Sequence, residues 1–251
     1  MVIFLGAGPG DPELVTVKGA RALASADVVI YAGSLVNPAL LGLCKEDCVI
    51  FNSAEMTLER VIARISESHQ SGKKIVRLHT GDPGLYGAIR EQMDALKSMG
   101  IPYSIIPGVS SFSGAAAAVE AEYTLPGVSQ SVIITRLAGR TSVPEAEQLR
   151  LLASHGCTMV IFLSAGMLDR VQEELLAGAY TETTPAAIVY KATWPEEKVV
   201  RCPLGRLAET GKAHQITNTA LVLVGGFLGD HYERSKLYDP AFSTGFRSGT
   251  L

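Results

Sequence analysis

The first half of the chain alternates short apolar stretches with amphipathic ones, and this alternation limits the possible fold more than any other feature. Apolar stretches at 2–5, 27–31, 49–51, 74–79 and 103–106 are typical of buried strands. Most of them run into a loop that contains glycine, and a stretch with helical periodicity follows. Strands that alternate with helices in this way form a parallel α/β sheet.

The second half alternates less regularly. Strands are predicted at 131–135, 158–163, 186–189, 199–202 and 219–224, and helices near 144–153 and 167–176. The tetrapeptide Trp194-Pro195-Glu196-Glu197 lies between two of these strands and is typical of a hairpin turn. Part of the second sheet is therefore expected to be antiparallel, which makes this sheet mixed.

A stretch rich in turn residues, 124–130, interrupts the pattern near the middle of the chain and is interpreted as a linker. The predicted organisation is an N-terminal α/β lobe at 1–123, a C-terminal α/β lobe at 131–229, and a tail at 230–251. The tail is polar, and its end is rich in glycine and serine. We expect it to be poorly ordered or packed as a strap.

Composition excludes several classes of protein. Hydrophobic residues make up 47% and charged residues 19% of the 251 residues, which is typical of a globular protein. A net charge of −3 does not favour a general nucleic-acid surface. No apolar run reaches the roughly 18 residues that a membrane span needs, and the N-terminus lacks a signal-peptide pattern, so a soluble cytoplasmic protein is expected. Neither the cysteines nor the histidines have metal-ligand spacing, so no bound metal is predicted.

The first glycine-rich loop, 6–11, follows a strand and precedes a helix, as a dinucleotide-binding loop does. The match fails at three points. Asp11 stands where the third glycine should be, and Pro9 lacks an amide donor for a pyrophosphate. The second predicted strand ends at Ala32-Gly33 rather than at the acid that binds a ribose. Nicotinamide binding is therefore disfavoured.

A second glycine-rich loop follows the strand at 74–79 and reads Thr80-Gly81-Asp82-Pro83-Gly84-Leu85-Tyr86-Gly87. Ligands bind at the carboxyl ends of strands in α/β sheets, and glycines let a ligand approach the backbone closely. On these residues alone, a plain turn explains the sequence equally well. If the two lobes face each other, similar loops at other strand ends line one cleft suited to a small, polar, weakly anionic ligand.

The stretch 6–19 resembles the first signature of the tetrapyrrole (corrin/porphyrin) methylases, and 77–83 resembles the second. Pro107-Gly108-Val109-Ser110-Ser111 and Thr219-Ala220-Leu221 are similar to further blocks of that family, so the resemblance spans about 1–228. Within the family, 31–37, 84–89 and 125–131 resemble the branch that methylates precorrin-4 or cobalt-precorrin-4 at C-11 during corrin synthesis.

The resemblance implies a two-lobed α/β fold distinct from the Rossmann methyltransferases, usually a homodimer, with S-adenosylmethionine in the cleft between the lobes. Cofactor contacts are then expected at Pro9, Thr80, Gly81, Asp82, Leu85, Tyr86, Ser110, Ser111, Leu163, Ala192, Thr219 and Ala220. The carboxylate of Asp82 or nearby backbone oxygens would hold the polar end of the cofactor. Leu163 and Ala192 would enclose its adenine.

The substrate implied by the resemblance is a tetrapyrrole with many carboxylates. Tyr31 and Tyr86 are expected to face its ring, and Ser34, Lys18, Arg90 and Arg136 are further candidates by their positions near the loops. Relatives that methylate uroporphyrinogen III carry an aspartate where this chain has Ala32. A base is therefore missing at that place, and no catalytic residue is predicted. The expected reaction is direct displacement of the methyl group.

Three alternatives stay open. The first is another methylase of the same fold, acting at a different precorrin position or on RNA ribose, although the charge balance disfavours RNA. The second is a nicotinamide-dependent oxidoreductase. The third is a binding module that sequesters a tetrapyrrole without modifying it.

Overall fold

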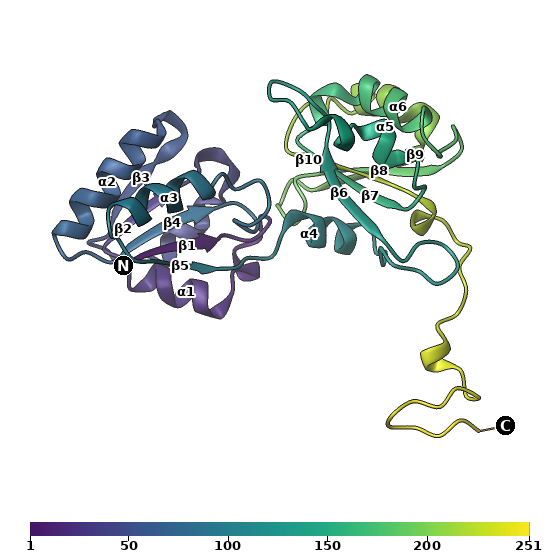
Figure 1. Ribbon diagram of the computed structural model, residues 1–251, viewed down its shortest axis with the longest axis horizontal. Helices are drawn as coiled ribbons and strands as arrows, with labels where there is room; N and C mark the ends of the chain where they lie inside the picture. The colour runs from purple at the N-terminus through teal and green to yellow at the C-terminus, as the bar shows by residue number, and fades with distance from the viewer. Residues whose placement is uncertain (251) are drawn as a thin grey trace. The chain divides into compact units, whose positions relative to one another are not determined.

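The computed structural model describes residues 1–250, apart from the side chain of Ser34, and folds into two compact units (Figure 1). The first unit comprises Met1–Gly114 and Lys191–Glu197, and the second comprises Ala115–Tyr190 and the chain from Lys198 onward. This division differs from the predicted lobes in two places: the chain passes between units at 114/115 rather than at 124–130, and 191–197 joins the first unit.

The first unit contains a five-stranded parallel sheet, as predicted. Its strand order is β3 (Val49–Asn52), β2 (Val28–Tyr31), β4 (Ile75–His79), β1 (Val2–Gly6) and β5 (Tyr103–Ile106). Each pair of neighbours is parallel and in continuous register, so all five carboxyl ends lie along one edge. That edge carries the glycine-rich loops.

Helices cover both faces of this sheet (Figure 1). Helix α1 (Val17–Ala24) packs on one face, where its Leu23 joins a core with Leu5 and Leu78. Helices α2 (Leu58–Gln70) and α3 (Arg90–Ser98) pack on the other face, around Phe4 and Ile30. Because successive side chains of a strand point to opposite faces, the strand residues divide between these two cores by alternation.

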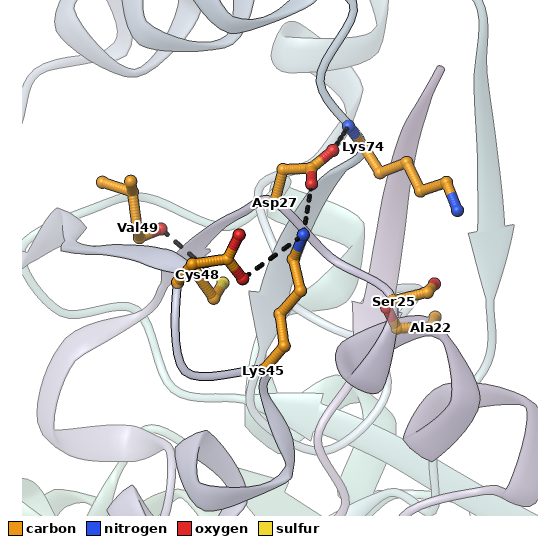
Figure 2. Close-up of polar contacts among 8 residues, drawn as sticks. Ala22, Ser25, Asp27, Lys45, Cys48, Val49 and Lys74 are labelled. Atoms are coloured by element: carbon orange, nitrogen blue, oxygen red, sulfur yellow. Dashed lines mark hydrogen bonds and ion pairs between the residues drawn. The ribbon is translucent and has the colours of Figure 1, made fainter.

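At the opposite edge of the sheet, where strands β2 and β4 begin, charged residues form hydrogen bonds and ion pairs (Figure 2). The Asp27 carboxylate accepts hydrogen bonds from Lys45 Nζ and from the backbone N–H of Lys74, each at 2.6 Å. The Lys45 hydrogen bond is the main reason that the pKa of Asp27 is lowered to about 2. Lys45 also lies 3.5 Å from the Asp47 carboxylate. These contacts hold the strand starts together on the side away from the glycine-rich loops.

The second unit contains a mixed five-stranded sheet, also as predicted. Its strand order is β6 (Val132–Arg136), β7 (Thr158–Phe162), β10 (Ala220–Val224), β8 (Pro185–Tyr190) and β9 (Lys198–Pro203). Strands β6 and β7 are parallel, and the other neighbours are antiparallel. Its helices include α5 (Leu149–Ala153), α6 (Leu168–Leu176) and α7 (Leu207–Ala213), and α4 (Ser111–Ala118) spans the passage from the first unit.

Sequence patterns missed α7 because Gly211 lowers the helix propensity of that stretch. Gly211 is there for packing, since an added Cβ would lie 2.1 Å from Leu168 Cδ1 of α6. The helix predicted near 144–153 is shorter than expected, with a 3₁₀ turn before α5. No described helix is long and apolar enough to cross a membrane.

Short 3₁₀ helices occupy many of the connections. They are η1 (Pro12–Leu14), η2 (Gly33–Leu35), η3 (Pro38–Leu43), η4 (Ser53–Glu55), η5 (Glu145–Glu147), η6 (Ala165–Met167), η7 (Leu204–Arg206), η8 (Gly226–Leu228) and η9 (Lys236–Tyr238). In the described part of the tail, η9 is the one helical turn. Arg247 donates hydrogen bonds to the carbonyls of Leu237 and Asp239 there.

Candidate functional site

Three glycines bring three loop backbones into direct contact at the carboxyl edge of the parallel sheet. They are Gly6 at the end of β1, Gly81 after β4 and Gly108 after β5. A Cβ added to Gly108 would lie 2.2 Å from the Gly81 carbonyl oxygen and 2.8 Å from Gly6 Cα. Gly81 also donates its N–H to the Gly8 carbonyl at 2.8 Å. The edge is therefore built from backbone, and its polar groups lie close together around small residues.

The Asp82 carboxylate joins two of these loops. Its Oδ1 accepts the backbone N–H of Gly84 at 2.7 Å, and its Oδ2 accepts the backbone N–H of Gly108 at 2.8 Å. The sequence indicated a ligand-binding role for this carboxylate, and the structure adds a positioning role. Each oxygen has a second lone pair, so the carboxylate retains acceptor capacity.

The segment 191–197 packs against the first glycine-rich loop and hydrogen-bonds to it. Trp194 Nε1 donates to the Pro9 carbonyl at 2.9 Å, and Thr193 Oγ1 accepts the Asp11 N–H at 3.0 Å. A Cβ on Gly10 would lie 2.1 Å from the Trp194 ring, so only glycine lets the ring approach. These contacts explain why this segment belongs to the first unit, and they bring Ala192 into the same unit as Pro9. The turn at Trp194 was predicted, but this partner was not.

Several predicted site residues have backbone conformations that are uncommon for residues other than glycine. The φ angles are 55° at Tyr86, 54° at Leu163 and 49° at Thr219. Such strain persists only where surrounding structure holds it, and it is concentrated at ligand sites and switch regions. Leu163 also exposes 65% of its surface directly after β7. Ligand contact by these three residues stays a prediction.

Two basic residues of strand β4 are buried on the face covered by α2 and α3. Arg77 is 6% exposed and His79 is 4% exposed. Burial lowers the pKa of Arg77 to about 10. It also lowers the pKa of His79 to about 3, with the Arg77 charge as a further cause. His79 Nε2 has no hydrogen-bond partner among the described residues, so His79 is neutral near pH 7.

Acid should destabilise the protein partly through His79. The unfolded chain protonates this side chain below its ordinary pKa of 6.5, whereas the folded chain does so only near 3. Above pH 6.5, His79 is neutral in both states and does not change the free energy of unfolding. Between pH 6.5 and 3, its contribution lowers the free energy of unfolding by about 1.4 kcal/mol per pH unit as the pH falls. Urea unfolding measures the free energy of unfolding of the natural protein and of the His79→Asn variant at several pH values. This free energy should fall less steeply with falling pH in the variant.

The matched control for this comparison is His155→Asn, which makes the same substitution at an exposed histidine. That variant should keep the slope of the natural protein. Equal slopes for the natural protein and His79→Asn would contradict a neutral, buried His79. Subtracting one curve from the other removes the contribution of the carboxylates, which also lose stabilising contacts in acid.

Comparison with known proteins supports the family inferred from the motifs. The model of the Tetrapyrrole (Corrin/Porphyrin) Methylases matches residues 1–208. The chain belongs to this family. A cobalt-precorrin-4 C(11)-methyltransferase of Methanocaldococcus jannaschii is 54% identical, over 98% of this chain and 95% of the relative.

Two solved structures extend the comparison. The X-ray structure of the cobalt precorrin-4 methyltransferase CbiF has a TM-score of 0.89 and 45% identity, covering 91% of this tetrapyrrole methylase and 96% of that chain. The uroporphyrin-III C-methyl transferase of Thermus thermophilus, complexed with S-adenosyl homocysteine, has a TM-score of 0.74 and 27% identity. The match covers 90% of this chain and 92% of that chain. The predicted α/β fold with one parallel and one mixed sheet is therefore confirmed.

Most cofactor contacts predicted for this tetrapyrrole methylase lie in its first unit. They are Pro9, Thr80, Gly81, Asp82, Leu85, Tyr86, Ser110, Ser111 and Ala192. The remaining ones, Leu163, Thr219 and Ala220, lie in the second unit. Within the first unit, the contacts around Gly81, Asp82 and Gly108 bring the predicted loops together at one sheet edge.

The predicted substrate residues have varied surroundings. Arg90 pairs with Asp94 at 2.9 Å on α3, and Arg136 donates to the carbonyls of Thr141 and Ser142 in the second unit. Lys18 is exposed on α1, and Tyr31 is partly buried at the end of β2. The prediction for the Ser34 side chain lies outside the described residues. Substrate contact by these residues stays a prediction.

The structure assigns no metal centre to the described chain. Within residues 1–250, no group of three or more histidine, cysteine or acidic side chains is arranged to hold a metal ion. The four cysteines are free thiols of intermediate burial.

Proposed function

We propose that this chain transfers a methyl group from S-adenosylmethionine to C-11 of cobalt-precorrin-4 or precorrin-4 in corrin synthesis. The observation that carries the proposal is its 54% identity over nearly the whole chain to a relative named as the cobalt-precorrin-4 C(11)-methyltransferase. The glycine-rich loops at the carboxyl edge of the first sheet support it, because they are intact and closely packed.

The loops of the first unit suit the cofactor chemically. Its amino-acid end needs hydrogen-bond acceptors for an ammonium group and donors for a carboxylate. Backbone groups of 80–85 and 108–111 offer both kinds, and Asp82 retains acceptor capacity. Leu85 is half-buried and offers apolar surface for less polar parts, and we keep the buried Ala192 as a proposed contact. We keep Leu163, Thr219 and Ala220 of the second unit as proposed contacts.

S-adenosylmethionine supplies a methyl group that its sulfonium already activates. When bound, it would give this methyl group to a nucleophilic ring carbon, and its sulfur would keep the electron pair of the broken sulfur–carbon bond. The residues of this chain would orient the ring and exclude water, because alignment of two bound reactants accounts for much of such a rate. Ala32 provides no base, and the neutral, buried His79 is poorly suited to accept a proton near pH 7.

The decisive experiment is a methyl-transfer assay with isotopically labelled S-adenosylmethionine and precorrin-4, with and without cobalt. We expect one labelled methyl group, located at C-11 by NMR, and faster turnover of the cobalt form. Uroporphyrinogen III serves as the matched alternative substrate and should not react. Methylation at another carbon would replace the C-11 proposal with another member of the same fold.

Two further outcomes separate the remaining alternatives. Thermal protection by NAD but not by S-adenosylmethionine would favour an oxidoreductase. Binding of the tetrapyrrole without turnover would favour a binding module. We also propose a homodimer and a cytoplasmic location. Light scattering tests the homodimer and should give twice the 26.6 kDa mass of the chain, and cell fractionation tests the location.

A further inference from the structure

We propose that Arg77 and Gln92 are positioning residues, which together hold the loop that carries Tyr86 in the conformation needed to receive the tetrapyrrole. This inference rests on the proposed function for its substrate. Its structural core is a chain of hydrogen bonds that runs from the buried strand β4, through helix α3, to the backbone of that loop.

The first link is a buried guanidinium. Arg77 Nε donates to Gln92 Oε1 at 3.1 Å, and one terminal nitrogen donates to the Ile30 carbonyl at 3.1 Å. No carboxylate within residues 1–250 forms an ion pair with Arg77. A buried charge without a counter-ion is costly, and an apolar side chain would usually be tolerated better at such a position. Stability alone therefore explains this arginine poorly.

The second link is the side-chain amide of Gln92, which is also 6% exposed. While its oxygen accepts from Arg77, its Nε2 donates to the Ala88 carbonyl at 2.9 Å. The guanidinium cannot accept a hydrogen bond, so it fixes which end of the amide faces it. The amide nitrogen is thereby directed at the loop.

The third link is a loop that needs such support. Tyr86 and Ala88 have φ angles of 55° and 48°, which side chains other than glycine rarely adopt. Between them, a Cβ on Gly87 would lie 2.3 Å from the Pro83 carbonyl oxygen. His79 also hydrogen-bonds to the Gly87 backbone. The loop is fastened at Asp82 on one side and at Ala88 on the other, with Tyr86 between.

The consequence concerns the Tyr86 side chain, which exposes 45% of its surface. Its direction follows from the backbone angles at Tyr86, and those angles are strained unless both ends of the loop are held. Losing the Gln92 contact should let the backbone at 86–88 relax. The aromatic surface offered to the macrocycle would then move, while the Asp82 end of the loop keeps its own hydrogen bonds.

The test is Gln92→Glu. This variant keeps an acceptor for Arg77 and adds a counter-charge, so the fold should remain as stable as the natural one. The carboxylate cannot donate to the Ala88 carbonyl and repels it. We expect faster hydrogen exchange in a peptide covering 83–89, and roughly a tenfold increase in KM for the tetrapyrrole. The affinity for S-adenosylhomocysteine should change far less.

Gln172→Glu in the second unit is the matched control. Gln172 also donates its Nε2 to a backbone carbonyl, that of Gly205 at 3.1 Å, and accepts a backbone N–H from Ala208. Its variant loses the same kind of contact and should leave both KM and exchange at 83–89 unchanged. Arg77→Lys is a second test, because one ammonium cannot reproduce the planar fork, and it should raise exchange at 83–89 as well.

The inference would be overturned by a folded Gln92→Glu variant in which amide hydrogen exchange at 83–89 and the KM for the tetrapyrrole both equal those of the natural protein. The exchange measurement requires no turnover. If the natural protein fails to methylate any precorrin, faster exchange at 83–89 still supports the positioning of the loop, while the proposed substrate is withdrawn. Should Gln92→Glu fail to fold, natural exchange in Arg77→Lys would equally overturn the inference.

Discussion

Replacing Gly108 by alanine is expected to destabilise the protein by about 3 kcal/mol or more and to remove cofactor binding. The new methyl group would lie 2.2 Å from the Gly81 carbonyl oxygen and 2.8 Å from Gly6 Cα. Both neighbours are backbone atoms, so no change of rotamer can relieve the overlap. The loops after β1, β4 and β5 would have to separate, and they carry most of the proposed cofactor contacts. Thermal unfolding and calorimetric titration with S-adenosylhomocysteine measure the two effects.

Gly42→Ala is the matched control for this substitution. Gly42 is exposed, and an added Cβ would meet no atom within 4 Å. Its stability should stay within about 0.5 kcal/mol of the natural value. A Gly108→Ala variant with natural melting temperature and natural cofactor affinity would show that the three loops can move apart at little cost.

Replacing Asp82 by asparagine should weaken binding of S-adenosylmethionine by roughly tenfold or more, with a smaller loss of stability. The carboxylate accepts one backbone N–H from its own loop and one from the loop after β5. An amide has one oxygen, so its NH₂ group must face one of these two donors. The contact between the loops is then lost or strained. Isothermal titration measures the affinity directly.

Asp169→Asn provides the control, since it removes a carboxylate that pairs with Lys212 at 2.7 Å on the surface of the second unit. An exposed pair of this kind contributes at most about 1 kcal/mol, and the cofactor affinity should not change. Unchanged affinity in Asp82→Asn would mean that the carboxylate neither contacts the cofactor nor positions the loops that do.

Local pattern predicted the parallel sheet well because its central strands β1, β2 and β4 are mostly buried and its edge strands β3 and β5 are apolar as well. Its apolar stretches, and the glycine-containing turns that end most of them, are visible without any long-range information. The start of helix α2 is local too, since the Thr57 side chain accepts the Arg60 N–H three residues along the chain. Helix α7 escaped detection because Gly211 serves a contact with Leu168, which lies far away in the chain.

The candidate site, like the fold, has local features that the sequence predicts and long-range contacts that it does not. The sequence by itself determined that small residues and one carboxylate follow the central strands, because such loops are local and their residue types are restricted by turn geometry. Only the tertiary structure decided what those residues contact. Trp194 donates a hydrogen bond to the Pro9 carbonyl, 185 residues away in the chain. Gln92 connects Arg77 to the Ala88 carbonyl by two further hydrogen bonds. Such contacts depend on how the strands and helices pack, and no periodicity in the chain records that packing.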